Sequence, residues 1–384
     1  MLIEIKGVQF VNKGAELMLY AILQQLKEQL PDAEICLAHN ANSPYTKRAE
    51  IGAFQKVGLL KNIVDLNRVF YFVPKKIRQY FKNRFGIVTE ADIDVILDAS
   101  GFSYGDQWSD LVLHQVANEV TRLKAQNKKY IFLPQSLGPF TREENKKYAQ
   151  KAFSNASLVF AREEPSFNHI EELNGASTNL FRAPDFTNLL CPENSQFFAK
   201  YKDYFVVIPN SKMLSSKNKD TSWKANYVDV IKTLIEKALA DGEHVVILNH
   251  SGNDDSELCS LIQNGLSKVC DIIEPKTALE VKAVIGGAKA VVSSRFHGCV
   301  SALSQGVPCL ATSWSHKYLE LFKEYNSEHL LLNSKSSKDS LHNSLEQVLN
   351  PEKQWLKGLK DNAEHYKLQS AEMWQRVVNV VKGR

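Results

Sequence analysis

Short apolar runs alternate with longer amphipathic stretches along the whole chain. The first apolar run covers residues 2–9. In the stretch that follows, Leu19, Ile22 and Leu26 keep the spacing of one helix face until Pro31 stops the pattern. Such a regular exchange of strand-like and helix-like segments is typical of βα units arranged around parallel sheets. The pattern therefore predicts an α/β protein.

Further strands and helices are expected in both halves of the chain. In the first half, strands are predicted at residues 93–99, 129–133 and 158–161, with helices near 109–126, 141–153 and 166–173. In the second half, strands are predicted at residues 205–208, 244–248, 269–273, 290–293 and 309–312. Both halves thus show a series of short buried strands separated by longer segments.

The length of 384 residues exceeds what one hydrophobic core usually supports, so two domains are expected. Residues 186–203 break the alternating pattern and are the predicted linker. We expect a Rossmann-like lobe at residues 1–190, a second at 200–350, and a helical segment at 351–384 that could cross back onto the first lobe. Ligands of such folds bind beyond the carboxyl ends of the strands, which predicts a site in a cleft where the two lobes face each other.

Composition narrows the class of protein. The net charge of +4 and the 44% hydrophobic content are usual for a soluble globular protein and too mildly basic for a dedicated nucleic-acid binder. The six cysteines include no Cys-x-x-Cys pair, so we interpret them as buried thiols of a reducing compartment. No signal peptide, apolar run of membrane-spanning length, nucleotide-binding glycine loop or metal-ligand spacing is recognised. A cytoplasmic protein without a metal site is predicted.

The sharpest candidate for chemistry is the polar end of the apolar run at residues 290–293. Ser294, Arg295 and His297 follow this strand and precede a helix of small residues. In an extended chain the side chains of Arg295 and His297 would leave the same face, and Gly298 would let a ligand or backbone come close. The helix N-terminus beside them offers N–H groups to an anion. The alternative is that Arg295 pairs with a structural carboxylate and that His297 only packs.

This segment resembles the polysaccharide pyruvyl transferase family, in whose C-terminal lobe an Arg-x-His pattern follows a strand and a Gly-Val-Pro turn comes next. Other segments resemble family motifs in the same order: Asn12-Lys13-Gly14-Ala15-Glu16, Asp98-Ala99-Ser100-Gly101-Phe102-Ser103, Leu133-Pro134-Gln135-Ser136-Leu137-Gly138-Pro139, Ala161-Arg162-Glu163-Glu164-Pro165-Ser166, Ala183-Pro184-Asp185 and Ser315-His316-Lys317. The resemblance spans residues 5–325. Residues 100–102 hold one glycine where many members have a glycine run, and residues 13–15 replace an acidic variant of the first loop.

The resemblance implies a two-lobed GT-B type fold and transfer of a carboxyvinyl unit from phosphoenolpyruvate to sugar hydroxyls, giving a pyruvate ketal on a polysaccharide or its precursor. It implies no further cofactor, an acceptor side in the first lobe and a donor side in the second. Arg295 would bind the donor, His297 would act as acid or stabilise phosphate, and Lys13 and Arg162 would be second cations. The residues expected to contact substrate are Asn12, Lys13, Gly14, Gly101, Gln135, Arg162, Asp185, Ser294, Gly298 and Lys317.

Each loop of the first half also has a structural alternative. Asn12 with its two neighbours can be explained as a plain strand–helix turn, and Gln135 as part of a β-turn. Arg162 sits beside two glutamates, which favours a salt bridge almost as much as a phosphate contact. Asp185 is as well explained by a loop-holding role as by a ligand contact.

Residues 68–85 are basic and aromatic and contain no acidic residue. Such a stretch can lie on an anionic membrane surface, where a lipid-linked oligosaccharide acceptor would be presented. We favour the other interpretation, an amphipathic helix whose aromatic face packs into the first lobe.

Two other functions stay open. A nucleotide-sugar glycosyltransferase would share the two-lobed architecture, and a sugar-binding protein without activity could keep the same fold. Binding of a nucleoside diphosphate would indicate the glycosyltransferase, and binding of phosphoenolpyruvate would indicate the pyruvyl transferase. Binding of neither would indicate the protein without activity.

Overall fold

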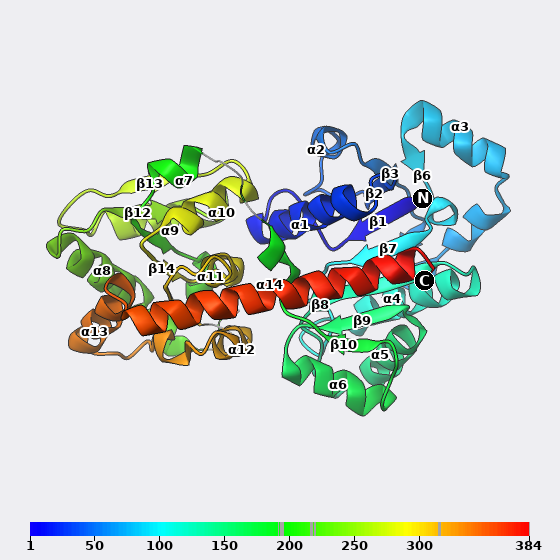
Figure 1. The fold of residues 1–384 in the computed structure, drawn as a ribbon. Helices are drawn as coiled ribbons and strands as arrows, with labels where there is room; N and C mark the ends of the chain where they lie inside the picture. The colour runs from blue at the N-terminus through cyan, green and yellow to red at the C-terminus, as the bar shows by residue number, and fades with distance from the viewer. Residues whose placement is uncertain (191, 193–195, 216–217, 219, 314–315, 384) are drawn as a thin grey trace. The chain divides into compact units, whose positions relative to one another are not determined.

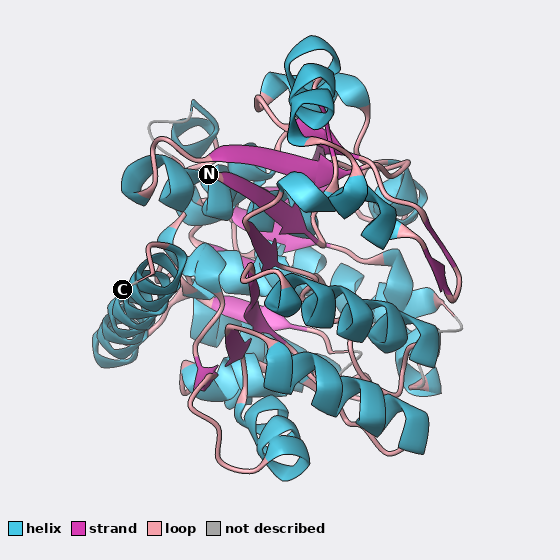
Figure 2. Ribbon diagram, turned by 90° about the vertical axis from the view of Figure 1, so that its right-hand side faces the viewer, coloured by secondary structure: helices cyan, strands magenta, loops and turns pink. Residues whose placement is uncertain are grey.

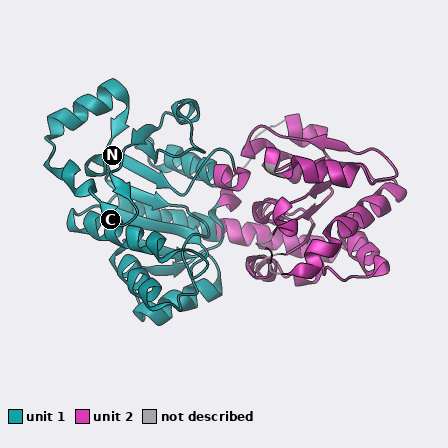
Figure 3. Cartoon of the chain, turned by 180° about the vertical axis from the view of Figure 1, so that it is seen from behind, with its two compact units in different colours: residues 1–11, 18–186, 369–384 teal, residues 12–17, 187–368 magenta. Residues whose placement is uncertain are grey.

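The computed structural model describes residues 1–190, 192, 196–215, 218, 220–313 and 316–383. They form two compact units, each built around a parallel sheet (Figures 1 and 3). Unit 1 comprises residues 1–11, 18–186 and 369–384, and unit 2 comprises residues 12–17 and 187–368. The α/β class predicted from the alternating pattern is confirmed.

The sheet of unit 1 has eight strands in the order β10-β9-β8-β7-β1-β2-β3-β6, and its neighbours are all parallel. Its strands are β1 (Leu2–Lys6), β2 (Glu34–Ala38), β3 (Phe54–Lys56), β6 (Ile87–Val88), β7 (Val95–Asp98), β8 (Lys129–Gln135), β9 (Leu158–Ala161) and β10 (Leu180–Arg182). The chain winds outward in both directions from the central pair β1 and β7, so the topological switch point lies between these two strands.

Helices cover this sheet, and Figure 2 shows strands lying between layers of helices. The helices of this part of the chain are α1 (Lys13–Gln29), α2 (Tyr45–Glu50), α4 (Asp110–Ala125), α5 (Glu143–Asn155) and α6 (Glu164–Asn174), with the 3-10 turns η2 (Glu90–Asp92) and η3 (Phe186–Leu189). Ser109 caps α4 by accepting a hydrogen bond from Leu111 N at 3.3 Å. The buried face of α4 packs against Phe132 and Phe153 in one hydrophobic cluster.

Between β3 and β6 the chain leaves the sheet. It forms an antiparallel pair, β4 (Leu60–Lys61) and β5 (Val64–Asp65), then the 3-10 turn η1 (Asn67–Phe72) and helix α3 (Lys75–Phe85). In Figure 1, α3 stands out beside β6. No residue of α3 is buried, and its large apolar side chains are exposed. The helix predicted here exists, but the interpretation that its aromatic face packs into the first lobe is wrong.

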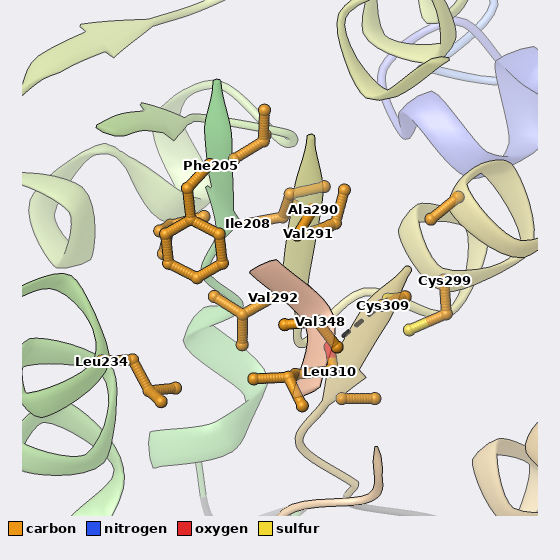
Figure 4. Packing of buried hydrophobic residues seen from close by; sticks show 14 of the residues in the cluster. Phe205, Ile208, Leu234, Ala290, Val291, Val292, Cys299, Cys309, Leu310 and Val348 are labelled. Carbon is orange, nitrogen blue, oxygen red and sulfur yellow. Dashed lines mark hydrogen bonds between the residues drawn. The ribbon is translucent and has the colours of Figure 1, made fainter. Parts of the chain in front are cut away.

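The sheet of unit 2 has five parallel strands in the order β13-β12-β11-β14-β15. They are β11 (Phe205–Ile208), β12 (Val245–Leu248), β13 (Asp271–Ile273), β14 (Ala290–Ser293) and β15 (Cys309–Ala311). Around them lie α7 (Gln196–Lys200), η4 (Ser211–Leu214), α8 (Thr221–Ala240), α9 (Asn253–Gln263), α10 (Ala278–Gly287), α11 (Phe296–Leu303), α12 (Lys317–Glu324), η5 (Glu328–Leu330) and α13 (Lys338–Leu349). Strands β11, β12 and β14 are buried along their full length, which explains why Ser293 at the end of β14 is their only polar residue. Figure 4 shows side chains of β11 and β14 in this core.

The last helix, α14 (Lys353–Val381), contributes to both units, because the residues up to Leu368 belong to unit 2 and the following ones to unit 1. In unit 1, Trp374 is buried and its ring lies edge-on to the ring of Phe186, with 6.2 Å between the ring centres. None of the described helices combines the length and the apolar composition that a membrane crossing needs.

Five cysteines are free and buried, as the sequence predicts, and Cys191 lies outside the described residues. Burial raises the pKa of the Cys36, Cys259 and Cys309 thiols. These thiols are therefore protonated near neutral pH and behave as small apolar side chains.

Candidate functional site

The chain turns tightly from β14 into α11. Ser293 ends the strand and α11 begins at Phe296, so Arg295 occupies the N-cap of the helix. Ser293 Oγ accepts a hydrogen bond from Arg295 N at 3.1 Å and donates one to the Arg295 carbonyl at 2.9 Å. His297 consequently lies in the first turn of α11. The expectation that Arg295 and His297 leave one face of an extended segment is wrong, and the helix start brings them together instead.

Gly298 fits this turn because it has no side chain. A Cβ atom at this position would lie less than 3.0 Å from Ser293 Oγ and 3.3 Å from Ile208 Cδ1. The first turn of α11 can therefore lie directly against the ends of β11 and β14. The atoms that approach Gly298 in the structure belong to the protein itself.

The guanidinium of Arg295 is held on one side by a buried carboxylate. Its Nη2 forms an ion pair with Asp255, whose side chain is fully buried and whose Oδ1 also accepts a hydrogen bond from Ser211 N at 3.0 Å. The alternative that Arg295 pairs with a structural carboxylate is thus confirmed for this contact. Within the described part of the chain, Arg295 Nε has no hydrogen-bond partner. Asp255 therefore orients the guanidinium while leaving donor capacity for another acceptor.

A second histidine lies close to these cations. His250 follows β12 by two residues and is buried. Burial is the largest cause of a pKa well below the usual value for His250, and the positive charges of Arg295, His297 and Lys13 add to it. The His250 imidazole is therefore neutral near pH 7. We call Lys13, His250, Arg295 and His297 the basic cluster of unit 2.

The first loop of the chain reaches this cluster. A Cβ atom on Gly14 would lie 2.5 Å from His297 Nδ1, so only glycine lets the backbone pass so close to the imidazole. Lys13 Nζ pairs with Glu16 at 2.8 Å and donates a hydrogen bond to the carbonyl of Lys276. The sequence predicted Lys13 and Gly14 as site residues because they match a family motif. In the structure Gly14 lies beside His297, and the charge of Lys13 acts on His250.

Asn12 has a structural role in the same loop. Its Oδ1 accepts hydrogen bonds from Gly14 N at 2.9 Å and Ala15 N at 3.4 Å, which caps the start of α1. The strand–helix turn that was the alternative for this loop is therefore present.

Two other predicted residues lie near α11. The hydroxyl of Ser294 is fully buried and forms hydrogen bonds of 2.7 Å with Tyr227 Oη and with Thr312 Oγ1. It stabilises the turn from within. Lys317 begins α12, and its Nζ lies 4.8 Å from the centre of the Phe296 ring. Ser315, which precedes it in the matched motif, lies outside the described residues.

The remaining predicted residues belong to unit 1. The amide of Gln135 is buried and donates to the carbonyls of Asp98 and Leu133, each at 3.2 Å. Arg162 lies 3.4 Å from Asp185 Oδ2, so the structure brings these two predicted residues together.

Arg162 also lies 3.4 Å from Glu163, and the salt bridge considered for it is present. Gly101 adopts a left-handed conformation (φ 70) beside Met18. In unit 1, Gln135, Arg162 and Asp185 are thus buried and engaged with protein groups just beyond or at the carboxyl ends of β8, β9 and β10.

Two functional candidates of unit 2 were not predicted. His250 was not singled out from the sequence, and it lies two residues after the end of β12. Its position just after a buried strand is the signal that identified Arg295, and the same rule would have found it. Asp255 could not be found in this way, because its pairing depends on how α9 packs. No group of three metal-ligating side chains occurs among the described residues.

The arrangement favours binding of an anion. Lys13, Arg295 and His297 are basic side chains, and the N-terminus of α11 adds the positive end of its dipole. The guanidinium of arginine can form two parallel hydrogen bonds to a carboxylate or phosphate, and histidine can exchange a proton near neutral pH. A small molecule that carries both acidic groups suits this cluster.

Solved structures of similar fold cover nearly the whole chain. A putative UDP-N-acetylglucosamine 2-epimerase from Listeria monocytogenes is 11% identical, with a TM-score of 0.61 over 100% of this chain and 96% of that chain. Alr3699/HepE from Anabaena, in complex with UDP and glucose, is 13% identical, with a TM-score of 0.57 over 100% of both chains. MurG from Acinetobacter baumannii is 9% identical, with a TM-score of 0.52 over 100% and 99%. These likenesses show the fold alone, and it is of the GT-B type.

The comparison with curated proteins gave no match. The family model described as polysaccharide pyruvyl transferase, by contrast, matches residues 12–316. This range includes all four residues of the basic cluster, from Lys13 to His297. The chain is a transferase and belongs to the polysaccharide pyruvyl transferase family.

Proposed function

We propose that this protein transfers a carboxyvinyl unit from phosphoenolpyruvate to two hydroxyls of a sugar in a polysaccharide or its precursor, in the making of exopolysaccharide or cell envelope. The observation that carries the proposal is the basic cluster, where a lysine, an arginine and a histidine meet the start of one helix in a chain of this family. Phosphoenolpyruvate has one carboxylate and one phosphate, which such a cluster can bind together. No further cofactor or metal is part of the proposal.

The chemistry sets clear requirements. A proton adds to the methylene carbon of the donor, and a sugar hydroxyl attacks the neighbouring carbon, whose positive charge the site must stabilise. A second hydroxyl then displaces the phosphate and closes the ketal. One hydroxyl proton balances the new methyl group and the other leaves with phosphate. The reaction thus consumes no water and needs no oxidant.

We propose that Arg295 binds the carboxylate or the phosphate of the donor, because Asp255 holds its guanidinium in place. His297 is the proposed acid or phosphate-stabilising group, and Lys13 is the second cation. The neutral His250 adds a polar group without adding charge. Substrate contacts by Gly101, Gln135, Arg162 and Asp185 of unit 1 belong to the same proposal.

His297→Ala is expected to lower pyruvyl transfer at least about a hundredfold, the usual worth of one proton-transferring group. Phosphate release from phosphoenolpyruvate, with a panel of acceptor glycosides, measures it. His342→Ala, on α13 of the same unit, is the matched control and should be as active as the wild type. Near-normal activity of the His297 variant, with unchanged circular dichroism, would sink the assignment.

Donor identity is tested by thermal-shift titration with phosphoenolpyruvate and, separately, with UDP and GDP. Because the cluster suits a carboxylate and a phosphate on one small molecule, phosphoenolpyruvate should raise the melting temperature, and Arg295→Gln should abolish the rise. The UDP-bound HepE structure of the same fold favours the rival, a nucleotide-sugar glycosyltransferase. Stabilisation by a nucleoside diphosphate alone would establish that rival, and no stabilisation by either would favour a protein without activity.

The low pKa of His250 predicts a pH effect on stability. Below the usual histidine pKa of about 6.5, the unfolded chain binds a proton at this position and the folded chain does not, so the free energy of unfolding falls as the pH falls. The slope from this group is at most about 1.4 kcal/mol per pH unit. His250→Asn should flatten the decline between pH 7 and 5 in urea titrations. An unchanged slope would mean that His250 titrates normally.

Part of the proposal concerns where the acceptor is presented. In unit 1, η1 and α3 expose Phe72 (86%), Tyr80 (60%) and Phe85 (56%), and α3 holds five basic and no acidic residues. Exposed aromatic rings among basic side chains are typical of a helix that lies on an anionic membrane surface. We propose that this face contacts the inner side of the membrane and that the acceptor is a lipid-linked oligosaccharide.

Vesicle sedimentation tests the membrane contact. The wild type should bind phosphatidylcholine vesicles that contain about one-third phosphatidylserine, and raised salt should weaken the binding, because Lys and Arg near such a surface contribute about 1 kcal/mol each. Tyr80→Ser with Phe81→Ser should lose it. Leu261→Ser with Val269→Ser, which removes two exposed apolar side chains of unit 2, should keep it. Equal binding of both double variants would rule out α3 as the contact.

A further inference from the structure

The edge of the unit 2 sheet that carries the basic cluster also holds polar atoms that the protein itself does not satisfy. Among the residues that the structure describes, Asn249 Oδ1, His250 Nδ1 and Arg295 Nε are buried and have no hydrogen-bond partner. Buried polar atoms of native proteins are hydrogen-bonded in the large majority of cases, because an unpaired one costs free energy. Three such atoms on neighbouring loops indicate a ligand that would supply their partners.

The loops that carry these atoms are tied together over the end of β11, which lies between β12 and β14 in the sheet. Asn210, two residues after β11, donates a hydrogen bond to the Ser294 carbonyl at 2.8 Å. Ser211 N donates to Asp255 Oδ1 at 3.0 Å, and the other oxygen of Asp255 pairs with Arg295. The start of α9, and with it the loop after β12, therefore lies against the turn that holds Arg295.

His250 belongs to a loop with a fixed conformation. In this loop Asn249 Nδ2 donates to the carbonyl of Gly252 at 3.0 Å and to Glu274 at 3.2 Å. Gly252 has a φ of 56, a conformation that favours glycine, and it forms the N-cap of α9. His250 itself is only 4% exposed. The surrounding hydrogen bonds therefore hold the imidazole in place before any ligand enters.

The surroundings of His250 keep its imidazole neutral in the protein without ligand. Burial is the main cause of the lowered pKa, and the positive charges that add to it belong to Arg295, His297 and Lys13. The carboxylates of the neighbouring elements already have partners, and these pairs are Asp255 with Arg295, Glu16 with Lys13, and Glu274 with the amide of Asn249. An entering anion would therefore favour the protonated imidazole, which the protein alone disfavours.

The charge of the anion decides how far this effect goes. Burial and basic neighbours both oppose the imidazolium, so a single negative charge offsets only part of their effect. A phosphate monoester carries about two negative charges near neutral pH and has three strong acceptor oxygens. Arg295 Nε and a protonated His250 Nδ1 are both donors that could bind such oxygens. This place beside the guanidinium therefore suits a phosphate better than a carboxylate.

We propose that His250 binds the phosphate group of the donor and takes up one proton from the solvent as this group enters. Nδ1 then donates a hydrogen bond to a phosphate oxygen, and the proton returns to the solvent when phosphate leaves. This inference rests on the proposed function, since it adds a contact and a proton-linked step to the donor site. Because the complex holds one proton more than the free protein, donor affinity should rise as the pH falls.

Isothermal titration calorimetry with phosphoenolpyruvate tests the proton uptake. The same titration in buffers of different ionisation enthalpy, at about pH 7.5, gives the number of protons taken up on binding. The wild type should take up about one proton more than His250→Asn, which keeps a neutral polar group but cannot titrate. His342→Asn, on α13 of the same unit, should match the wild type. Equal uptake by the wild type and His250→Asn would overturn the proposal.

NMR of protein labelled with ¹⁵N in its histidines gives a second measurement, which does not require the variant to bind. The His250 signals are those missing from the spectrum of His250→Asn. Both ring nitrogens of His250 should shift from values of a neutral imidazole to those of an imidazolium when phosphoenolpyruvate is added. A merely structural histidine would not change its protonation state, so a neutral His250 in the complex would also refute the assignment.

The pH dependence of binding and a second probe separate this inference from the donor function. The affinity of the wild type for phosphoenolpyruvate should increase up to about tenfold more per unit of falling pH than that of His250→Asn. If the donor function is wrong, phosphoenolpyruvate will give no binding heat with the wild type. Inorganic phosphate at millimolar concentration then replaces it in the same measurements. Proton uptake with phosphate that His250→Asn lacks would preserve the role of His250, and no uptake would reject it.

Discussion

Burial of both faces of the parallel sheet of unit 2 decides where that unit can hold charge. Strands β11, β12 and β14 contribute no exposed residue, so any charged group on them would have to be desolvated. Polar side chains therefore collect after the strands end, at the edge where helix N-termini also gather. His250 and Arg295 occupy this edge in unit 2. The glycines at positions 14 and 298 then let the surrounding backbone close around them.

The same constraint explains what the sequence predicts well. Fully buried strands such as β9 and β14 have the bounds expected from their apolar runs, because burial of every residue gives each run its apolar sequence. Short strands such as β3 and β6 escaped prediction, since two or three residues carry no periodic signal. Arg295 and His297 were found from their position after a strand. Their true geometry was not, because the extended chain and the first helical turn look alike in sequence at that point.

Other features depend on contacts far apart in the chain and could not be predicted. Asp255 meets Arg295 across 40 positions, and Lys56 meets Glu4 across 52. Amphipathic periodicity in residues 68–85 predicted a helix correctly, but it also suggested a buried apolar face. Periodicity shows that a helix has two faces and does not show which face meets the protein. The exposure of α3 follows only from its place beyond the edge strand β6.

The two units use charge in opposite ways. In unit 2 the basic side chains of the cluster gather around a buried histidine, and burial together with their positive charges lowers the pKa of His250. In unit 1 the buried Lys56 of β3 lies between two carboxylates, 2.6 Å from Glu4 and 2.8 Å from Glu119. A cluster of basic side chains favours anions, whereas paired charges largely cancel one another. The carboxyl ends of the strands in the two units therefore differ in the charge that they present, although both sheets are parallel.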